Sequence, residues 1–171
     1  VWPDKMILVF RGTEAHSPSD LLADANFVMQ APVGAGWVHQ GYFNELNKLW
    51  DDVSRDIRTY RDMSFPPIPI WVTGHSLGAA MATLVATRGI PLEAVITFGE
   101  PMVGHSYASS FTAKQHLRYV NGDDPAIYYP LPFGYEHHGK EIKINEASPN
   151  ILYDHAIIYY VENLTPERAK Q

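Results

Sequence analysis

A serine lies between two glycines in the segment Gly74–Gly78, Gly-His-Ser-Leu-Gly, and this segment constrains the fold more than any other part of the chain. It follows the apolar run Ile68–Val72 and precedes the helix-like run Ala79–Val85. A sharp turn between a strand and a helix needs glycines there, because its backbone is strained and the helix packs closely under the strand. Such a turn exposes the hydroxyl of Ser76 and points free helix amides at any negative charge that forms beside it. The flanks therefore favour a nucleophile on a strand–turn–helix unit, whereas the pentapeptide alone also fits a Gly-Ser-rich loop.

A serine hydroxyl is a weak nucleophile at neutral pH, so this interpretation requires a histidine base and an acid that orients the histidine. In folds of this kind they follow the serine in the order Asp, His. Asp124 lies in a polar, proline-stopped loop after the strand-like run His116–Val120, and His155 lies near the end of the chain. Taken singly, Asp124 also fits a turn-capping aspartate and His155 a helix-capping or core histidine. Their occurrence together with Ser76 makes them the candidate acid and base.

Apolar runs and helical spacing alternate along the chain, which predicts a mostly parallel α/β sheet flanked by helices. The longest helix is expected near residues 41–62, where a core-facing apolar stripe recurs at helical spacing. Its members are Phe43, Leu46, Leu49, Trp50, Val53, Ile57 and Tyr60. Strands are expected at 6–10, within 28–38, and at 69–73, 94–98, 116–120 and 141–144, a loop at 14–27, and further helices at 76–88, near 105–113 and from about 155.

The composition fits one domain that spans residues 1–171. Of the 171 residues, 46% are hydrophobic and 19% are charged, which is enough apolar material for one core but too little chain for two domains. A formal net charge of −6 argues against nucleic acid as a partner, because phosphate binding needs a basic surface. The sequence has no run of 18 apolar residues that could span a membrane and no cysteine for a disulfide. The histidines lack metal-ligand spacing, so neither a metal nor another cofactor is expected.

Several motifs along the chain resemble those of one family. They are Phe10–Thr13, Val38–Tyr42, Gly74–Ala80, Thr97–Gly104, Phe133–Gly139 and Asp154–His155, the last followed by tyrosines one turn on. In this order they resemble the fungal-type, class 3 lipases of the α/β-hydrolase superfamily. The motifs run from residue 10 to residue 160, and several independent motifs in register are far more specific than one pentapeptide. The resemblance implies an α/β-hydrolase fold.

The resemblance also implies roles for individual residues. The implied catalytic triad is Ser76, Asp124 and His155, and the implied oxyanion hole consists of the backbone amides of Thr13 and Leu77. In another enzyme, the removal of one oxyanion-hole donor raises the activation free energy by about 2.7–4 kcal/mol. Asp123 competes for the role of the acid, but the family's acid stands four residues after the valine of the strand, which selects Asp124 after Val120.

The start of the chain departs from the family's pattern. Fungal-type lipases usually carry a helix and one or more strands before the strand that contains Phe10, whereas nine residues precede Phe10 here. We therefore expect a reduced N-terminal part of the sheet, or an edge that a partner covers. The chain begins with Val1 instead of methionine, which indicates a processed or trimmed form and is compatible with secretion and removal of a signal peptide. The sequence does not indicate an oligomeric state.

The resemblance leaves several substrate classes open. It implies a lipase that cleaves triacylglycerols and short- to medium-chain acyl esters, with feruloyl-type esterases and phospholipases A1 as alternatives in the same family. A catalytically inactive binding domain on this fold is the alternative from another class, and the intact serine, aspartate and histidine argue against it. The expected partner is an acylglycerol or another ester, with transient contact with a lipid–water interface.

Candidate substrate-binding residues lie beside the serine and in two other segments. His75 directly precedes Ser76. The segment Glu14–Ala25 matches the position of the family's lid, where Leu21 and Leu22 would form a short apolar face that shields the site in water. The alternative for this segment is an ordinary surface loop. Residues that fit either the wall of an acyl pocket or plain core are Tyr128, Tyr129, Leu131, Phe133, Tyr159 and Tyr160.

Overall fold

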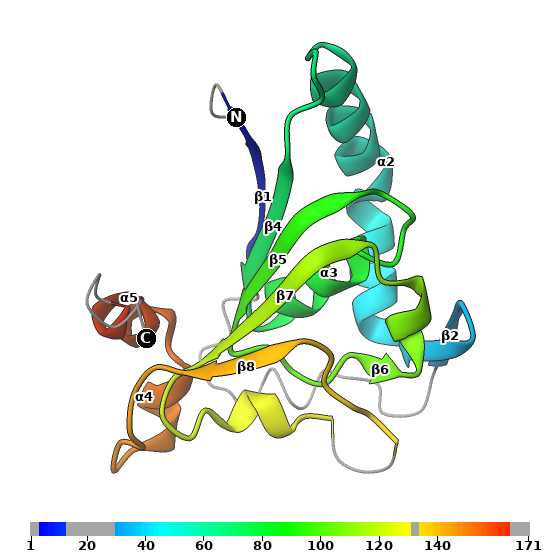
Figure 1. The fold of residues 1–171 in the computed structure, drawn as a ribbon. Coiled ribbons are helices and arrows are strands. Elements are labelled where there is room, and N and C mark those ends of the chain that lie inside the picture. Colours follow the sequence, from blue (N-terminus) through cyan, green and yellow to red (C-terminus); the bar gives the residue numbers. More distant parts are fainter. Residues whose placement is uncertain (1–3, 13–29, 131–133, 165–171) are drawn as a thin grey trace.

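In the part of the chain that the structure describes, the main sheet is parallel and has five strands. The computed structural model describes residues 4–12, 30–130 and 134–164, and all elements named below lie within these ranges (Figure 1). The strand order is β1–β4–β5–β7–β8, and every neighbouring pair runs parallel. The strands are β1 Met6–Phe10, β4 Ile70–His75, β5 Leu92–Phe98, β7 Ala113–Val120 and β8 Lys140–Lys143. A separate antiparallel sheet has the order β2–β3–β6 and consists of β2 Gln30–Val33, β3 Gly36–His39 and β6 Gly104–His105.

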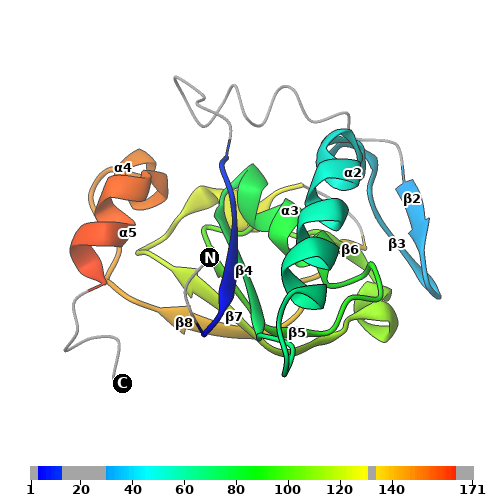
Figure 2. The same cartoon turned by 90° about the horizontal axis from the view of Figure 1, so that it is seen from above.

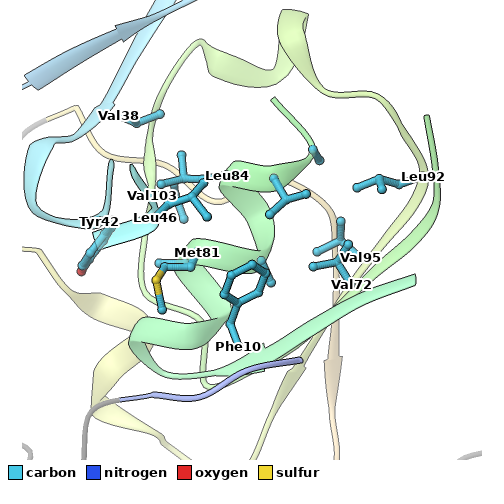
Figure 3. Close-up of a cluster of buried hydrophobic side chains, with 14 of the residues drawn as sticks. Phe10, Val38, Tyr42, Leu46, Val72, Met81, Leu84, Leu92, Val95 and Val103 are labelled. Atoms are coloured by element: carbon cyan, nitrogen blue, oxygen red, sulfur yellow. The ribbon is translucent and has the colours of Figure 1, made fainter. Parts of the chain in front are cut away.

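Two helices cover the core of the main sheet. α2 Gln40–Asp62 packs on α3 Leu77–Val85, and α3 contacts β1, β4 and β5. Every residue of α3 from Gly78 to Val85 is buried, and many of them are small, so this helix approaches the strands closely. Figure 3 shows the core that results, which includes Phe10, Leu46, Val72, Met81, Leu84 and Val95.

The other helices are short. A 3₁₀ helix, η1 Tyr107–Ser110, precedes β7, and a second, η2 Pro125–Tyr128, follows it. Near the end of the chain, α4 Ile151–His155 contacts η2 and is followed by α5 Ile157–Asn163. α4 and α5 lie on the opposite side of the molecule from α2 (Figure 2). None of these helices, nor any other in the described part of the chain, is long and apolar enough to cross a membrane.

The long amphipathic helix is confirmed, but its apolar stripe is only partly buried. Leu46 and Ile57 are fully buried, and Phe43, Trp50 and Val53 pack against the core. Leu49 and Tyr60 remain 45% and 41% exposed, so the prediction that they face the core was wrong. Leu49 lies about 60° around the helix from Leu46, on the flank of the stripe. Tyr60 lies in the last turn of a 23-residue helix, which is far longer than the nine-residue α3 on which it packs.

One expected helix differs from the structure, and one short helix was not expected. Residues 105–113 form no long helix: Gly104 and His105 pair with β3, and Ser106 adopts a left-handed φ of 52° that ends regular structure before η1. The helix expected from about 155 is confirmed as α5, which begins at Ile157, but the short helix α4 before it was not expected; the extended Ala156 (φ −66°, ψ 129°) separates the two. The strands expected near 6–10, 69–73, 94–98, 116–120 and 141–144 are confirmed to within a few residues at each end. The loop expected at 14–27 lies outside the described ranges.

Candidate active site

Ser76 lies on a sharp turn between β4 and α3. It has φ 58° and ψ −125°, a conformation that is rare for a residue with a side chain. The turn is possible because its two glycines have no Cβ at the points where the chain segments approach most closely. A Cβ on Gly74 would lie 2.3 Å from the carbonyl of Gly78, and a Cβ on Gly78 would lie 2.2 Å from the carbonyl oxygen of Phe10. The amide of Ser76 donates to the carbonyl of Phe98 at 3.0 Å, which ties the turn to the end of β5.

The structure brings the side chains of Ser76, Asp124 and His155 into one hydrogen-bonded chain. His155 Nε2 is 3.0 Å from Ser76 Oγ, and His155 Nδ1 is 2.8 and 2.9 Å from the two oxygens of Asp124. All three residues are buried. A proton on Nδ1 donates to the carboxylate, which leaves Nε2 as the acceptor for the serine hydroxyl. This is the arrangement in which an imidazole can remove the serine proton.

Asp124 and Asp123 point to different surroundings. Asp124 is fully buried, caps η2 by accepting from the amide of Ala126 at 2.8 Å, and contacts His155. The Asp123 carboxylate is exposed and pairs with Lys143 Nζ at 3.1 Å. Of the two sequence candidates for the acid, Asp124 is therefore the one in contact with the histidine.

Tyr160 contacts the candidate acid, and sequence reasoning missed this contact. Its hydroxyl donates to Asp124 Oδ2 at 2.6 Å, whereas we considered this residue only as pocket wall or core. Burial, and then the charge of Asp124, raise the pKa of Tyr160, so the hydroxyl keeps its proton. The available signal in the sequence was a tyrosine about one turn after the histidine.

A second buried carboxylate joins the acid-bearing loop to the histidine-bearing helix. Asp154 accepts from the amide of Asp123 at 3.0 Å and from the amide of Ser148. Asn121 Nδ2 donates to the backbone carbonyl of Asp154 at 3.1 Å. Because Asp154 directly precedes His155, these bonds couple the position of the acid to that of the base. No local sequence pattern pointed to this role.

His75 lies against His155. Its Nε2–H donates to the backbone carbonyl of His155 at 2.8 Å, and the two ring centroids are 4.7 Å apart. Burial, and then the charge of His155, lower the pKa of His75 to about 4, so its ring is neutral near pH 7. This geometry gives His75 a supporting contact with the base. Its contact with substrate stays a prediction.

The other predicted site residues differ in their burial and in their position in the fold. Leu77 is the first residue of α3, and the first amides of a helix have no acceptor within it. Its role as an oxyanion donor stays a prediction. Tyr129 is buried, and burial followed by the effect of Tyr135 raises its pKa to about 12. Tyr128 is 56% exposed on η2. Thr13, Leu21 and Leu22 lie in the part of the chain that the structure does not describe.

The residues that the structure describes contain no group of three or more His, Cys, Asp or Glu side chains placed to hold a metal ion. The side chains that meet at the site are those of the serine, its histidine and the buried carboxylate. Such a set suits nucleophilic attack on an acyl group.

Comparison with known proteins gives relatives that are named as lipases and as a phospholipase. The chain is 30% identical over 154 residues to the secreted mono- and diacylglycerol lipase A of Penicillium cyclopium, covering 85% of this chain and 49% of the relative. It is 39% identical over 149 residues to the chloroplastic phospholipase A(1) DAD1 of Arabidopsis thaliana, covering 73% of this chain and 33% of the relative. The chain therefore spans a third to a half of the length of these relatives.

Solved structures that resemble this chain are lipases as well, and they identify the fold. The Rhizomucor miehei lipase in its propeptide complex superposes with a TM-score of 0.69 at 28% identity, over 82% of this chain and 49% of that chain. Lipase II from Rhizopus niveus superposes with a TM-score of 0.71 at 26% identity, over 82% and 57%. The parallel sheet flanked by helices is thus the α/β-hydrolase fold. Residues 7–133 match the family described as lipase (class 3), and the chain belongs to this family.

Proposed function

We propose that this protein is a serine carboxylic-ester hydrolase, a lipase that cleaves acylglycerols and short- to medium-chain acyl esters. The observation that carries the proposal is the hydrogen-bonded chain from Ser76 through His155 to Asp124 at the turn after β4. A catalytically inactive binding domain would not need three buried polar side chains in this order, with the nucleophile on a strained turn.

The proposed reaction has two halves. His155 Nε2 takes the proton of Ser76 as the hydroxyl oxygen attacks the ester carbonyl, and the protonated ring then gives that proton to the departing alcohol. This leaves an acyl group on Ser76. Water, deprotonated by the same nitrogen, then attacks the acyl carbonyl, and the protonated ring returns its proton to Ser76 Oγ as the bond to the serine breaks and the fatty acid leaves. Asp124 holds the imidazole in the required tautomer and stabilises its charged form.

The negative charge that forms on the ester oxygen needs hydrogen-bond donors that are already in place. We propose the amide of Leu77 as one of them, because it is the first N–H of α3 and directly follows the nucleophile. The family resemblance supplies Thr13 as the second donor, and Leu21 and Leu22 as part of a lid. These three assignments rest on the sequence.

The relatives support two substrate classes. The Penicillium relative is named a mono- and diacylglycerol lipase, which favours acylglycerols for this chain. The Arabidopsis relative, at 39% identity, is named a phospholipase A(1), which makes phospholipids the second candidate. The Penicillium and Fusarium solani relatives are named as secreted, which supports secretion as the proposed location.

The function is tested by labelling and by a panel of esters. A fluorophosphonate probe should label the wild-type protein, and Ser76→Ala should lose both labelling and hydrolysis while it keeps the circular dichroism spectrum of the wild type. Retained turnover in Ser76→Ala would contradict the mechanism.

Tributyrin, a p-nitrophenyl ester chain-length series, phosphatidylcholine and methyl ferulate should then be compared at equal enzyme concentration. The proposal predicts the highest rates on tributyrin and on short- to medium-chain p-nitrophenyl esters. A preference for phosphatidylcholine would assign the phospholipase activity instead, and fast cleavage of methyl ferulate without tributyrin hydrolysis would assign a feruloyl esterase.

A further inference from the structure

A buried charged side chain lies directly behind the candidate triad and has no part in the proposed mechanism. Glu100 follows β5 by two residues and is almost completely buried. Burying a carboxylate without partners costs free energy, so a buried and hydrogen-bonded carboxylate at this position suggests a structural role. The position of the preceding residue, Gly99, indicates what that role is.

The backbone at Gly99 lies against the contact between acid and base. A Cβ built on Gly99 would lie 2.5 Å from Asp124 Oδ2 and 3.2 Å from His155 Nδ1. The preceding carbonyl, of Phe98, accepts the amide hydrogen bond of Ser76 at 3.0 Å. The turn formed by residues 98–100 therefore touches all three members of the triad.

This turn needs an anchor outside itself. Gly99 has φ 55°, a conformation open to glycine, and glycine is also the residue whose backbone is least restricted. Its amide donates to the carbonyl of Tyr119 at 3.1 Å, which fixes one side of the turn to β7. On the other side Gly99 is followed directly by Glu100. Because the two residues are covalently linked, fixing the Glu100 side chain restricts the movement of the Gly99 backbone.

Glu100 is held by two donors from two strands. Its Oε2 accepts from the hydroxyl of Thr97 on β5 and from Nε2–H of His116 on β7, the latter at 2.9 Å. His116 is itself fixed: its Nδ1 is 3.2 Å from His138 Nδ1, and its ring stacks on Phe111 with centroids 5.2 Å apart. The anchor therefore reaches from the turn into the body of the sheet.

The charges around Glu100 keep it ionised. Burial alone would raise the pKa of Glu100, but His116, the hydrogen bonds from His116 and Thr97, and the charge of Arg118 together lower it. Further groups face it from neighbouring segments: Tyr107 from η1, and His137 and His138 from the loop before β8. The carboxylate thus accepts both hydrogen bonds in its charged, stronger form.

We propose that Glu100 is a positioning residue for the triad, which acts through Gly99 to hold the contact between Asp124 and His155. The inference rests on the proposed hydrolase function. The proposal depends on the length of the Glu100 side chain more than on its charge. Oε2 accepts both hydrogen bonds, and Oε1 has no hydrogen-bond partner among the described residues. A neutral side chain of the same length therefore keeps the acceptor for both hydrogen bonds, whereas a shorter acid does not reach the two donors.

Two substitutions of Glu100 separate the effect of side-chain length from that of charge. Glu100→Gln keeps a carbonyl oxygen where Oε2 accepts both hydrogen bonds, and its NH₂ takes the place of the unpartnered Oε1. Glu100→Asp keeps the charge but is one methylene too short for the anchor. With p-nitrophenyl butyrate, we expect kcat to fall by about tenfold or more in Glu100→Asp with little change in KM, and by less than about threefold in Glu100→Gln.

A spectroscopic measurement tests the same contact without turnover. The proton that His155 Nδ1 shares with Asp124 should give a low-field NMR resonance in the wild type and in Glu100→Gln, and this resonance should shift or broaden in Glu100→Asp. Thr83→Val is the matched control, because Thr83 Oγ1 is 3.4 Å from the same His116 nitrogen but lies on α3, away from the turn. We expect this variant to lose stability and keep both kcat and the resonance.

Several results would overturn the inference. These are a Glu100→Asp variant with wild-type kcat and resonance, a Glu100→Gln variant as impaired as Glu100→Asp, or a Thr83→Val variant that perturbs the resonance as much as Glu100→Asp. Failure of the wild type to hydrolyse any ester would overturn the proposed function and with it the catalytic meaning of this anchor. Normal wild-type hydrolysis with unaffected Glu100 variants would overturn the anchor alone.

Discussion

At the scale of single residues, the acid of the candidate triad is the first assignment to test. Asp124→Asn should lower kcat on p-nitrophenyl butyrate by about 10⁴-fold, because an amide permits the wrong tautomer of His155. Asp123→Asn should change kcat by less than about tenfold, because its carboxylate is exposed and pairs with Lys143. Equal losses in the two variants, or the reverse order, would show that the other aspartate is the acid.

His75 gives the second residue-scale prediction, which concerns stability and pH. In the folded protein its pKa is lowered to about 4, first by burial and then by the charge of His155, whereas the unfolded chain takes up this proton near pH 6.5. The unfolded state thus binds more protons between these values, so the free energy of unfolding falls as the pH is lowered from 6.5 to 4. His75→Gln, whose amide can also donate to the carbonyl of His155, should lose less stability over this range.

Urea unfolding of the wild type and of His75→Gln at pH 7 and at pH 4.5 measures this difference directly. Other groups that titrate in the same range contribute equally to both proteins, so the comparison isolates the histidine. An identical loss of stability in the two proteins between these pH values would contradict the burial of a neutral ring at position 75.

At the scale of elements, the turn between β4 and α3 depends on how closely α3 approaches β1. A methyl group on Gly78 would lie 2.2 Å from the carbonyl oxygen of Phe10, a backbone atom in a strand paired with β4. Gly78→Ala should therefore destabilise the protein by about 3 kcal/mol, measured by urea unfolding. Gly89→Ala is the control: φ there is 74° and nothing lies within 4 Å, so only backbone strain of about 1 kcal/mol is expected. Similar losses in both variants would show that the close approach does not limit the fold.

Elements with a strong local pattern could be predicted from the sequence. Strands β1, β4 and β5 are mostly apolar runs, and α2 shows clear helical spacing, so these elements were found with small errors at their ends. The segment 105–113 could not be predicted, because its form is set by distant partners: His105 pairs with Trp37 of β3, and the Tyr107 side chain is fully buried. The break at Ala156 likewise has no local signal.

The same distinction holds for the candidate site. Ser76, Asp124 and His155 could be singled out because a motif, a chain order and a family resemblance all pointed to them. The contact of Tyr160 with Asp124 joins residues 36 apart, and that of Asp154 with the amide of Asp123 joins residues 31 apart. No local pattern identifies the partner in either contact, and the hydrogen bond from His116 to Glu100 depends in addition on the pairing of β5 with β7.

At the scale of the whole molecule, the parallel strands bring the site together at one edge of the sheet. Ser76 follows β4, Gly99 follows β5, and Asp124 lies in the loop after β7, so three neighbouring strands deliver their carboxyl ends to one place. His155 arrives from α4, on the opposite side of the molecule from α2 (Figure 2). The helix that follows it, α5, carries several exposed apolar side chains.

That exposed apolar surface leads to the last prediction. Ile157, Ile158 and Val161 of α5 are 49%, 54% and 64% exposed, and they follow His155 by two to six residues. We propose that they contact the lipid–water interface, where burial of each half-exposed side chain is worth about 1 kcal/mol. Ile158→Ser with Val161→Ser should therefore lower the rate on emulsified tributyrin by about tenfold and leave hydrolysis of dissolved p-nitrophenyl butyrate nearly unchanged. Leu49→Ser, which alters an equally exposed apolar residue on α2, should affect neither rate. If Leu49→Ser reduced the emulsion rate as much as the α5 variant, or if the α5 variant kept its full emulsion rate, α5 would not be the surface that meets the lipid.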